Sequence, residues 1–372
     1  MSPTTVKFNK ADRPEFFRAL RRRVNAHFEE TQQDRYANGH MVFKTVFMVA
    51  LYTIPLALIL SGTVTSFWWV LSLWATMGFG MAGIGLSIMH DANHGAYSRN
   101  PRVNQALGAL LNLIGGYHIN WKIQHNVLHH SYTNVHDFDE DIKKGIIRFS
   151  PNQPAHRGYY LQAFYAPFLY GLMTLVWVFV KDFVQLIDYG KRGLLKAQGL
   201  RFSTAMATVL FNKSWYLAIT LVLPILILPF AWWQTLLFFL MMHFICGIIL
   251  ALVFQPAHVI EETQFFKVDE NGSVENSWAI HQLMTTANFA NGNRLLSWYV
   301  GGLNYQIEHH LFPNICHVHY RDLSKIVKAT ALEYGLPYHE HPTFSAAIRS
   351  HFSLLHRLGT GSYDKKLAVS TS

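Results

Sequence analysis

Residues 233–258, WQTLLFFLMMHFICGIILALVFQPAH, decide the fold of this chain. The stretch contains no Asp, Glu, Lys or Arg, and it is longer than the roughly 20 apolar residues that a helix needs to cross the hydrocarbon core of a bilayer. Long apolar runs lie at about 42–61, 66–89, 214–231 and 233–256. These four runs predict an all-α integral-membrane protein with four transmembrane helices.

The composition supports a membrane location. Charged residues make up only 14% of the 372 residues, against about a quarter in soluble domains, and 51% are hydrophobic. The formal charge of +9 suits contact with anionic lipid, and the absence of RNA-binding motifs or zinc-finger spacing indicates no nucleic-acid partner. Cys246 and Cys316 form no CxxC pair, so neither a disulfide framework nor a thiolate metal site is expected.

The basic residues predict the orientation of the spans. The connectors between the first two runs and between the last two carry no Lys or Arg, whereas the other polar segments do. The positive-inside rule therefore places both termini and the large middle loop in the cytoplasm. The prediction depends on basic residues of the N-terminal segment, of the chain after Lys267 and of the polar segments between. The last group comprises Lys143, Lys144, Lys181, Lys191, Arg192, Lys196, Arg201 and Lys213.

A fifth apolar stretch, at about 161–180, lies between two basic loops, so a single crossing there would put basic loops on opposite faces. We therefore predict an interfacial helix, and a second one in the shorter run at about 104–117. No cleaved signal peptide is expected. The predicted organisation is a cytoplasmic segment (1–40), a membrane domain (41–345) that carries a cytoplasmic histidine-rich cap, and a C-terminal tail (346–372).

Histidine is abundant, with 21 residues against 22 Asp and Glu together, and it is clustered. Two pairs are spaced i, i+4, which places both rings on one face of a helix. The predicted topology brings every cluster to the cytoplasmic side, near the ends of the second and fourth spans. The clustered histidines are His90, His94, His125, His129, His130, His258, His309 and His310.

Eight imidazoles at one membrane face predict a metal centre. Imidazole binds iron, zinc, copper and nickel, and because one ion seldom takes more than about six ligands, eight suggest two ions. A catalytic zinc ion usually needs only three protein ligands. A centre of two metals next to an apolar bundle suits oxygen chemistry on a lipid.

The patterns HxxxH, HxxxHH and QxxHH resemble the membrane fatty acid desaturase family. The run at 301–313, GGLNYQIEHHLFP, resembles the front-end and acyl-lipid branch of that family. The segments around Trp121, Thr133 and Thr285 also resemble those of the family. The resemblance therefore covers about residues 40–345.

By this resemblance the eight histidines are ligands of two iron ions, and His258 is the ligand outside the three boxes. Gln255 matches a position from which an amide binds through water, and Gln306 replaces a liganding histidine, so both are expected as weak ligands or close neighbours of ligands. Acceptors beside the ligands should fix the tautomer of each ring. The candidates are Asp91, Asp137, Asp139, Asp141 and Glu308, and among them we select Asp91 and Glu308.

Polar and small residues within the spans predict helix packing. His243, inside the fourth span, is expected to make an interhelical hydrogen bond. The glycines of the second span indicate a close approach of neighbouring helices. They are Gly78, Gly80, Gly83 and Gly85.

The resemblance implies an O2-dependent desaturase that introduces a cis double bond into an acyl chain linked to CoA, a phospholipid or a carrier protein, with front-end or linoleoyl-type specificity. Many front-end desaturases carry a fused cytochrome b5 with a His-Pro-Gly-Gly motif, which this sequence lacks. A separate ferredoxin, or cytochrome b5 with its reductase, is therefore expected to supply electrons. The same observation favours the bacterial inner membrane over the endoplasmic reticulum.

Two alternatives are open from the sequence. A fatty acyl hydroxylase or epoxygenase would use the same histidine boxes, and product analysis distinguishes it from a desaturase. A membrane zinc protein, such as a hydrolase or a receptor-like metal site, would need fewer ligands and no electrons, and metal analysis distinguishes it.

Overall fold

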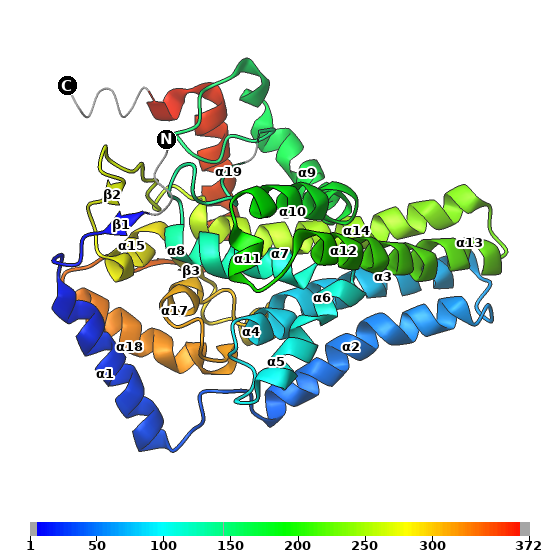
Figure 1. Cartoon of the computed structure of the whole chain (residues 1–372), viewed down its shortest axis with the longest axis horizontal. Coiled ribbons are helices and arrows are strands. Elements are labelled where there is room, and N and C mark those ends of the chain that lie inside the picture. Colours follow the sequence, from blue (N-terminus) through cyan, green and yellow to red (C-terminus); the bar gives the residue numbers. More distant parts are fainter. Residues whose placement is uncertain (1–5, 144, 365–372) are drawn as a thin grey trace. The chain divides into compact units, whose positions relative to one another are not determined.

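The computed structural model describes residues 6–143 and 145–364, and this part of the chain is mainly helical, as predicted (Figure 1). Two short parallel strand pairs accompany the helices: β1 (Lys7–Phe8) with β2 (Ser273–Val274), and β3 (Ala287–Phe289) with β4 (His339–His341). Lys144, used in the topology prediction, and residues 365–372 of the predicted tail lie outside the described residues.

The chain divides into two compact units. The first consists of Met1–Tyr36, Gln124–Pro167 and Leu252–Ser372, and the second of Ala37–Ile123 and Phe168–Ala251. Helices α9 (Gln162–Val176) and α14 (Trp232–His258) each have residues in both units. The predicted division near residues 40 and 345 follows membrane topology instead of packing, and it stays a prediction.

Long apolar helices and short connecting ones build the second unit. Besides parts of α9 and α14, its helices are α2 (Gly39–Leu60), α3 (Phe67–Gly83), α4 (Met89–Asn93), α5 (Pro101–Gly108), α6 (Leu110–Leu113), α7 (His118–Lys122), α10 (Asp182–Lys191), α11 (Leu194–Ala197), α12 (Phe202–Leu217) and α13 (Leu223–Ile227). π-helical turns at Ile84–Ile88, Trp177–Lys181 and Ala218–Val222 join α3 to α4, α9 to α10 and α12 to α13, so each pair forms one longer helix.

Five helices among the described residues are long and apolar enough to cross a membrane. They are Gly39–Leu60, Phe67–Asn93, Gln162–Lys191, Phe202–Ile227 and Trp232–His258. Four of them correspond to the predicted spans. The remaining one, Gln162–Lys191, includes the run predicted to lie in the interface. Since this helix meets the same criteria of length and composition as the others, its interfacial placement stays a prediction.

Lys213 requires a correction to the predicted topology. We predicted a polar segment there, before a span, but the helix already begins at Phe202, and Lys213 is buried within it. Its ammonium contacts the carboxylate of Asp182 on α10 and the backbone oxygens of Gly115 (2.5 Å) and Trp177 (3.3 Å). Because these partners satisfy its charge, the lysine is tolerated inside an apolar helix and does not mark a loop.

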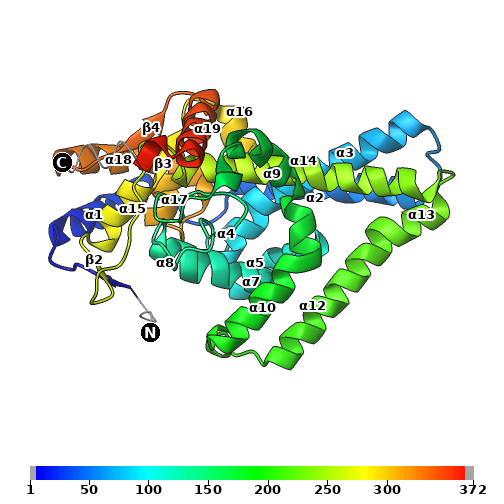
Figure 2. The ribbon, with the colours of Figure 1, turned by 90° about the horizontal axis from the view of Figure 1, so that it is seen from above.

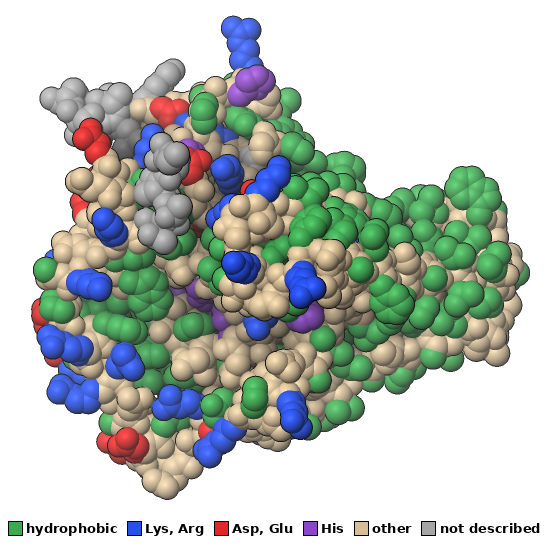
Figure 3. Space-filling view, in the orientation of Figure 1, with side chains coloured by type: hydrophobic (Ala, Val, Ile, Leu, Met, Phe, Trp, Pro, Cys, Tyr) green, Lys and Arg blue, Asp and Glu red, His purple; other side chains and the backbone are tan. Residues whose placement is uncertain are grey.

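The two short connectors predicted to share one side of the membrane lie close together. The ring of Phe67, at the start of α3, is 6.1 Å from that of Phe230 and 5.2 Å from that of Phe238. Exposed tryptophans flank both connectors, as in the aromatic belts of membrane–water interfaces. They are Trp68, Trp69, Trp232 and Trp233. Figure 3 shows mainly hydrophobic side chains over this end of the second unit, as a lipid-facing surface requires.

Glycines of α3 allow close packing against α2 and α14, and these three helices run side by side in Figures 1 and 2. A Cβ atom at Gly80 would lie 2.8 Å from the backbone nitrogen of Tyr52 on α2. One at Gly78 would lie 2.8 Å from the backbone oxygen of Met242 on α14. The predicted packing role is confirmed at both positions.

Gly80→Ala is expected to lower the free energy of unfolding by about 1–3 kcal/mol, because the added methyl group overlaps backbone atoms of α2 that cannot move without separating the helices. Gly39→Ala is the matched control, since no heavy atom lies within 4 Å of a Cβ at that position. Thermal unfolding of both variants in detergent tests the prediction, and equal midpoints would contradict it.

The first unit contains the core that positions most of the clustered histidines. Phe16 and Leu20 of α1 (Pro14–Thr31) belong to one hydrophobic cluster with Leu323 of α18 (Tyr320–Glu333). Leu283 and Ile307, next to the histidine boxes, join the same cluster. The further elements are the π-helical turn Ile123–His129, α8 (His130–Tyr132), α15 (Trp278–Thr285), α16 (Arg294–Tyr299), α17 (Gln306–Leu311), α19 (Phe344–Thr360), and 3-10 turns at Arg157–Tyr159 and His317–His319.

Candidate metal centre

The second histidine box lies on the π-helical turn Ile123–His129, which continues into α8. In an α-helix His130 would point about 140° away from His125, because each residue turns the chain by about 100°. The wider π-turn brings residues five apart to the same side. Nε2 of His130 lies 3.2 Å from Nε2 of His125, and the rings of His125 and His129 stack with centroids 5.4 Å apart. The turn therefore gathers all three histidines of the box.

The third box and the end of α14 complete a cluster in the first unit. Nε2 of His309 is 2.9 Å from Nε2 of His130, and the ring of His310 stacks on that of His130 with centroids 4.3 Å apart. The ring of His258 lies 4.8 Å from that of His129 and 4.7 Å from that of His310. Six predicted ligands, from three separate parts of the sequence, are thus buried together.

Among the candidate ligand groups of the first unit, two consist of three imidazoles and share one residue. One nitrogen from each of His129, His258 and His310 lies within 4.8 Å of the others, and the same holds for His130, His309 and His310. Two nitrogens that bind one ion at about 2.1 Å and at a right angle are about 3 Å apart. The Nε2 separations of 2.9 and 3.2 Å agree with this value, so the imidazoles fit metal ions.

Four of the rings are held from outside the cluster through Nδ1. The pairs are His129 with the carboxylate of Asp139 (3.2 Å), His258 with the backbone oxygen of Thr285 (3.1 Å), His309 with the hydroxyl of Tyr320 (3.2 Å) and His310 with the amide oxygen of Gln282 (2.8 Å). A proton on Nδ1 leaves the lone pair on Nε2, the nitrogen that remains for a metal ion. Nε2 of His258 is buried and has no hydrogen-bond partner among the described residues.

Asp139 is the acidic side chain most closely engaged with the cluster. It is fully buried, and its carboxylate also accepts hydrogen bonds from the backbone nitrogens of Asn134 and Asp141, each 2.9 Å long. Burial lowers the pKa of His129, but the charge and hydrogen bond of Asp139, with the charge of Asp141, outweigh burial and raise it. The side chain of Asp137, by contrast, is 58% exposed and lies 3.5 Å from Lys143.

Asp139→Asn is expected to weaken metal binding by about 10–100-fold, because the amide is a poorer acceptor for Nδ1 of His129 and orients the ring less firmly. Asp137→Asn is the matched control, since it makes the same change two residues away on an exposed side chain. Competition for the metal with a chelator measures both affinities. Unchanged binding in Asp139→Asn would contradict the orienting role.

The first box, in the second unit, brings its own two histidines together. The rings of His90 and His94 have centroids 4.8 Å apart, and both contact the ring of Trp121, at 5.4 and 5.9 Å. The carboxylate of Asp91 lies 3.8 Å from Nδ1 of His90, which is beyond hydrogen-bond distance. The ligand roles of the two histidines, and the orienting role of Asp91, stay predictions.

Three other predicted neighbours of the metal have defined surroundings. Gln306 is buried at the start of α17, and Gln255 is half-buried on α14, one turn before His258. The carboxylate of Glu308 accepts hydrogen bonds from the amide of Asn288 (2.8 Å) and the hydroxyl of Tyr338 (3.0 Å), while burial raises its pKa to about 7. The predicted roles of Gln255, Gln306 and Glu308 beside the metal remain predictions.

The buried histidine His243 has a structural role, as predicted. Its Nε2 lies 2.9 Å from the hydroxyl of Tyr216 on α12, and its Nδ1 lies 3.0 Å from the hydroxyl of Thr174 on α9. The expected interhelical hydrogen bond is therefore confirmed. In the first unit, Nε2 of His281 donates to the backbone oxygen of Thr133 (2.7 Å), which lies three residues after the second box.

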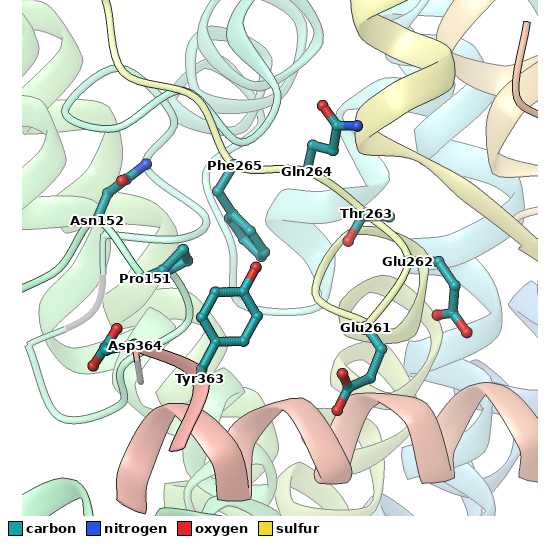
Figure 4. Close-up of a pocket in the computed structure, with 9 residues that line it drawn as sticks. All are labelled: Pro151, Asn152, Glu261, Glu262, Thr263, Gln264, Phe265, Tyr363 and Asp364. Carbon is teal, nitrogen blue, oxygen red and sulfur yellow. The ribbon is translucent and has the colours of Figure 1, made fainter. Parts of the chain in front are cut away.

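A pocket of about 570 Å³ in the first unit contains no clustered histidine (Figure 4). Figure 4 shows Phe265 and Tyr363 pointing toward one another across it. Its carboxylates already have partners, because Glu261 pairs with Arg357 and Asp364 makes two hydrogen bonds with the guanidinium of Arg148 (2.9 and 3.0 Å). The imidazole cluster, rather than this pocket, is the candidate functional site.

Apolar helices long enough to cross a membrane, together with a buried group of imidazoles whose nitrogens are oriented, define an integral-membrane protein with a histidine-rich candidate metal centre. Residues 66–342 match the fatty acid desaturase family. This chain belongs to the fatty acid desaturase family. It is therefore an oxidoreductase that desaturates fatty acyl chains, as the resemblance of its histidine boxes implies.

Characterised relatives extend over nearly the whole chain. The chain is 36% identical to the sn-1 linoleoyl-lipid 6-desaturase of Synechocystis sp., with 93% of this chain and 96% of the relative covered. It is 34% identical to an acyl-lipid (8-3)-desaturase of Physcomitrium patens, with 95% and 74% covered. It is 33% identical to the sn-1 linoleoyl-lipid 6-desaturase of Arthrospira platensis, with 96% of each covered. These similarities support the front-end and acyl-lipid branch.

Proposed function

We propose that this desaturase uses a di-iron centre and O2 to introduce a cis double bond into a lipid-linked acyl chain. The observation that carries the proposal is the orientation of the rings. Nδ1 of His258 and Nδ1 of His310 each meet a buried acceptor outside the cluster. Inside it, Nε2 of His130 lies 3.2 Å from Nε2 of His125 and 2.9 Å from Nε2 of His309. The proposed ligands are His90, His94, His125, His129, His130, His258, His309 and His310.

Iron held by these imidazoles would supply the oxidising power that the removal of hydrogen from an unactivated methylene group requires. Overall, one –CH2–CH2– unit, O2, two electrons and two protons become –CH=CH– and two water molecules. The residues of this chain contribute neutral nitrogen ligands in fixed orientations. They also contribute a buried site, which keeps bulk water from the reaction.

The proposed substrate is a linoleoyl or similar group esterified in a membrane lipid, desaturated with front-end specificity. The names of the relatives support this proposal, since two act on a linoleoyl lipid and one on an acyl lipid. A separate ferredoxin, or cytochrome b5 with its reductase, would deliver the electrons. We place both termini in the cytoplasm, because the basic segments flank the spans on one side. We favour a bacterial inner membrane because the sequence lacks the His-Pro-Gly-Gly motif of a fused cytochrome b5.

Expression in a host that lacks polyunsaturated lipids, fed with linoleate, tests the function. Mass spectrometry of the separated lipid classes is expected to show an additional cis double bond in acyl chains of membrane lipids, and no new product with a His310→Ala variant. A hydroxylated or epoxidised product would contradict desaturation. A product confined to acyl-CoA would contradict the lipid-linked substrate.

A further inference from the structure

Helix α15 supplies none of the proposed ligands, yet it contacts each part of the first unit that does. The indole of Trp278 donates to the backbone oxygen of His130 (3.2 Å), and the backbone oxygen of Thr285 accepts from Nδ1 of His258 (3.1 Å). Between these two residues lies Gln282, whose side chain is fully buried. The helix therefore connects the second box, the third box and the end of α14.

The side chain of Gln282 bonds to two boxes at once. Its amide nitrogen donates to the backbone oxygen of His130 in the second box (3.3 Å), and its amide oxygen lies 2.8 Å from Nδ1 of His310 in the third box. The hydroxyl of Thr133 also lies within hydrogen-bond distance of that oxygen, at 3.1 Å. One residue thus ties two segments that are far apart in the sequence.

The bond to His130 fixes which way the amide faces. A backbone carbonyl can only accept a hydrogen bond, so the nitrogen of the Gln282 amide must face His130 and the oxygen must face His310. An amide oxygen can only accept as well, and Nδ1 of His310 must therefore carry the proton. The lone pair of His310 is then on Nε2.

The residue that Gln282 contacts, His310, is shared by the two groups of three imidazoles in the first unit. We propose that Gln282 is a positioning residue that keeps the proton of His310 on Nδ1 and fixes the third box against the second. The proposal rests on the di-iron function proposed above. The neutral amide of Gln282 would then orient His310 as the carboxylate of Asp139 orients His129.

Two variants separate the acceptor from the packing. Gln282→Met keeps the length of the side chain but removes the acceptor, and it is expected to weaken iron binding by about 10–100-fold. Gln282→Glu restores an oxygen opposite Nδ1 of His310, so it is expected to bind iron at least about tenfold more tightly than Gln282→Met. Iron affinity is measured by competition with a chelator, and thermal unfolding of the metal-free protein reports stability.

Gln162→Met is the matched control. Gln162 is also fully buried and also makes three hydrogen bonds, but all of them go to backbone groups of Arg148 and Leu355 and none to a histidine. The control is expected to lose stability without losing iron affinity. If Gln282→Met binds iron as the wild type does, or if Gln282→Glu binds no better than Gln282→Met, the proposal is wrong. A wild-type protein that binds no iron would instead overturn the proposed function.

Discussion

Replacing His258 with alanine is expected to lower the iron affinity of its ligand group and the rate of desaturation by more than about 100-fold. This is a larger loss than the removal of a residue that only orients a ligand. The residue lies outside the three boxes, but its ring centroid is within 4.8 Å of His129 and within 4.7 Å of His310. Its Nδ1 is bonded to the backbone oxygen of Thr285, so Nε2 is the nitrogen left to bind metal. Alanine would remove one ligand from the group that these three histidines form.

His351→Ala is the matched control for this variant. His351 is likewise buried in the first unit, and its Nδ1 likewise donates to a backbone oxygen, that of Val259 (2.7 Å), but it belongs to none of the histidine groups. We expect this variant to lose stability while it retains its iron. Iron content per purified chain and product formation are measured for both. Full iron content in His258→Ala would contradict the ligand role.

The second large effect concerns the buried pair of Lys213 and Asp182 in the second unit. Lys213→Met is expected to destabilise the protein by about 3–5 kcal/mol, because it leaves the carboxylate of Asp182 buried without its cation. The indole of Trp177 (3.0 Å) and the amide of Asn120 (3.4 Å) would still donate to that carboxylate, but neutral donors do not replace an ammonium. The midpoint of thermal unfolding in detergent should fall by about 5–10 °C.

The double variant Lys213→Met/Asp182→Asn tests the cause of that loss. It removes both charges and keeps an acceptor for Trp177, so it is expected to recover about half of the lost stability or more. Lys196→Met, at an exposed position on α11, is the control and should change stability by no more than about 0.5 kcal/mol. A double variant as unstable as Lys213→Met alone would show that the buried charge is not the cause.

Much of the fold and of the candidate site follows from local sequence patterns. Runs of apolar residues predict long helices because a membrane span must satisfy its backbone hydrogen bonds internally. The box spacing predicts that His125 and His129 share a face, and their rings stack. The same spacing does not predict the position of His130. This ring lies beside His125 because of a π-helical turn, which spacing alone does not indicate.

The partners that orient the rings could not be predicted from spacing. Gln282 lies 28 residues from His310, and Tyr320 lies 11 residues from His309. Neither residue belongs to a histidine box. Asp139 is one of five acidic candidates, and its burial and its contact with His129 distinguish it from Asp137. The prediction that Lys213 lies in a polar segment is wrong for a related reason. Its partner, Asp182, lies on another helix, and without that partner a charged residue indicates a loop.

The metal content of the purified wild-type chain shows whether the imidazole cluster holds two iron ions. About two iron ions per chain are expected, and because His310 belongs to two groups of candidate ligands, His310→Ala is expected to lose iron. Elemental analysis and Mössbauer spectroscopy of iron-57 protein measure the number and the kind of iron sites. A single zinc ion per chain, or a His310→Ala variant that keeps two iron ions, would contradict the account.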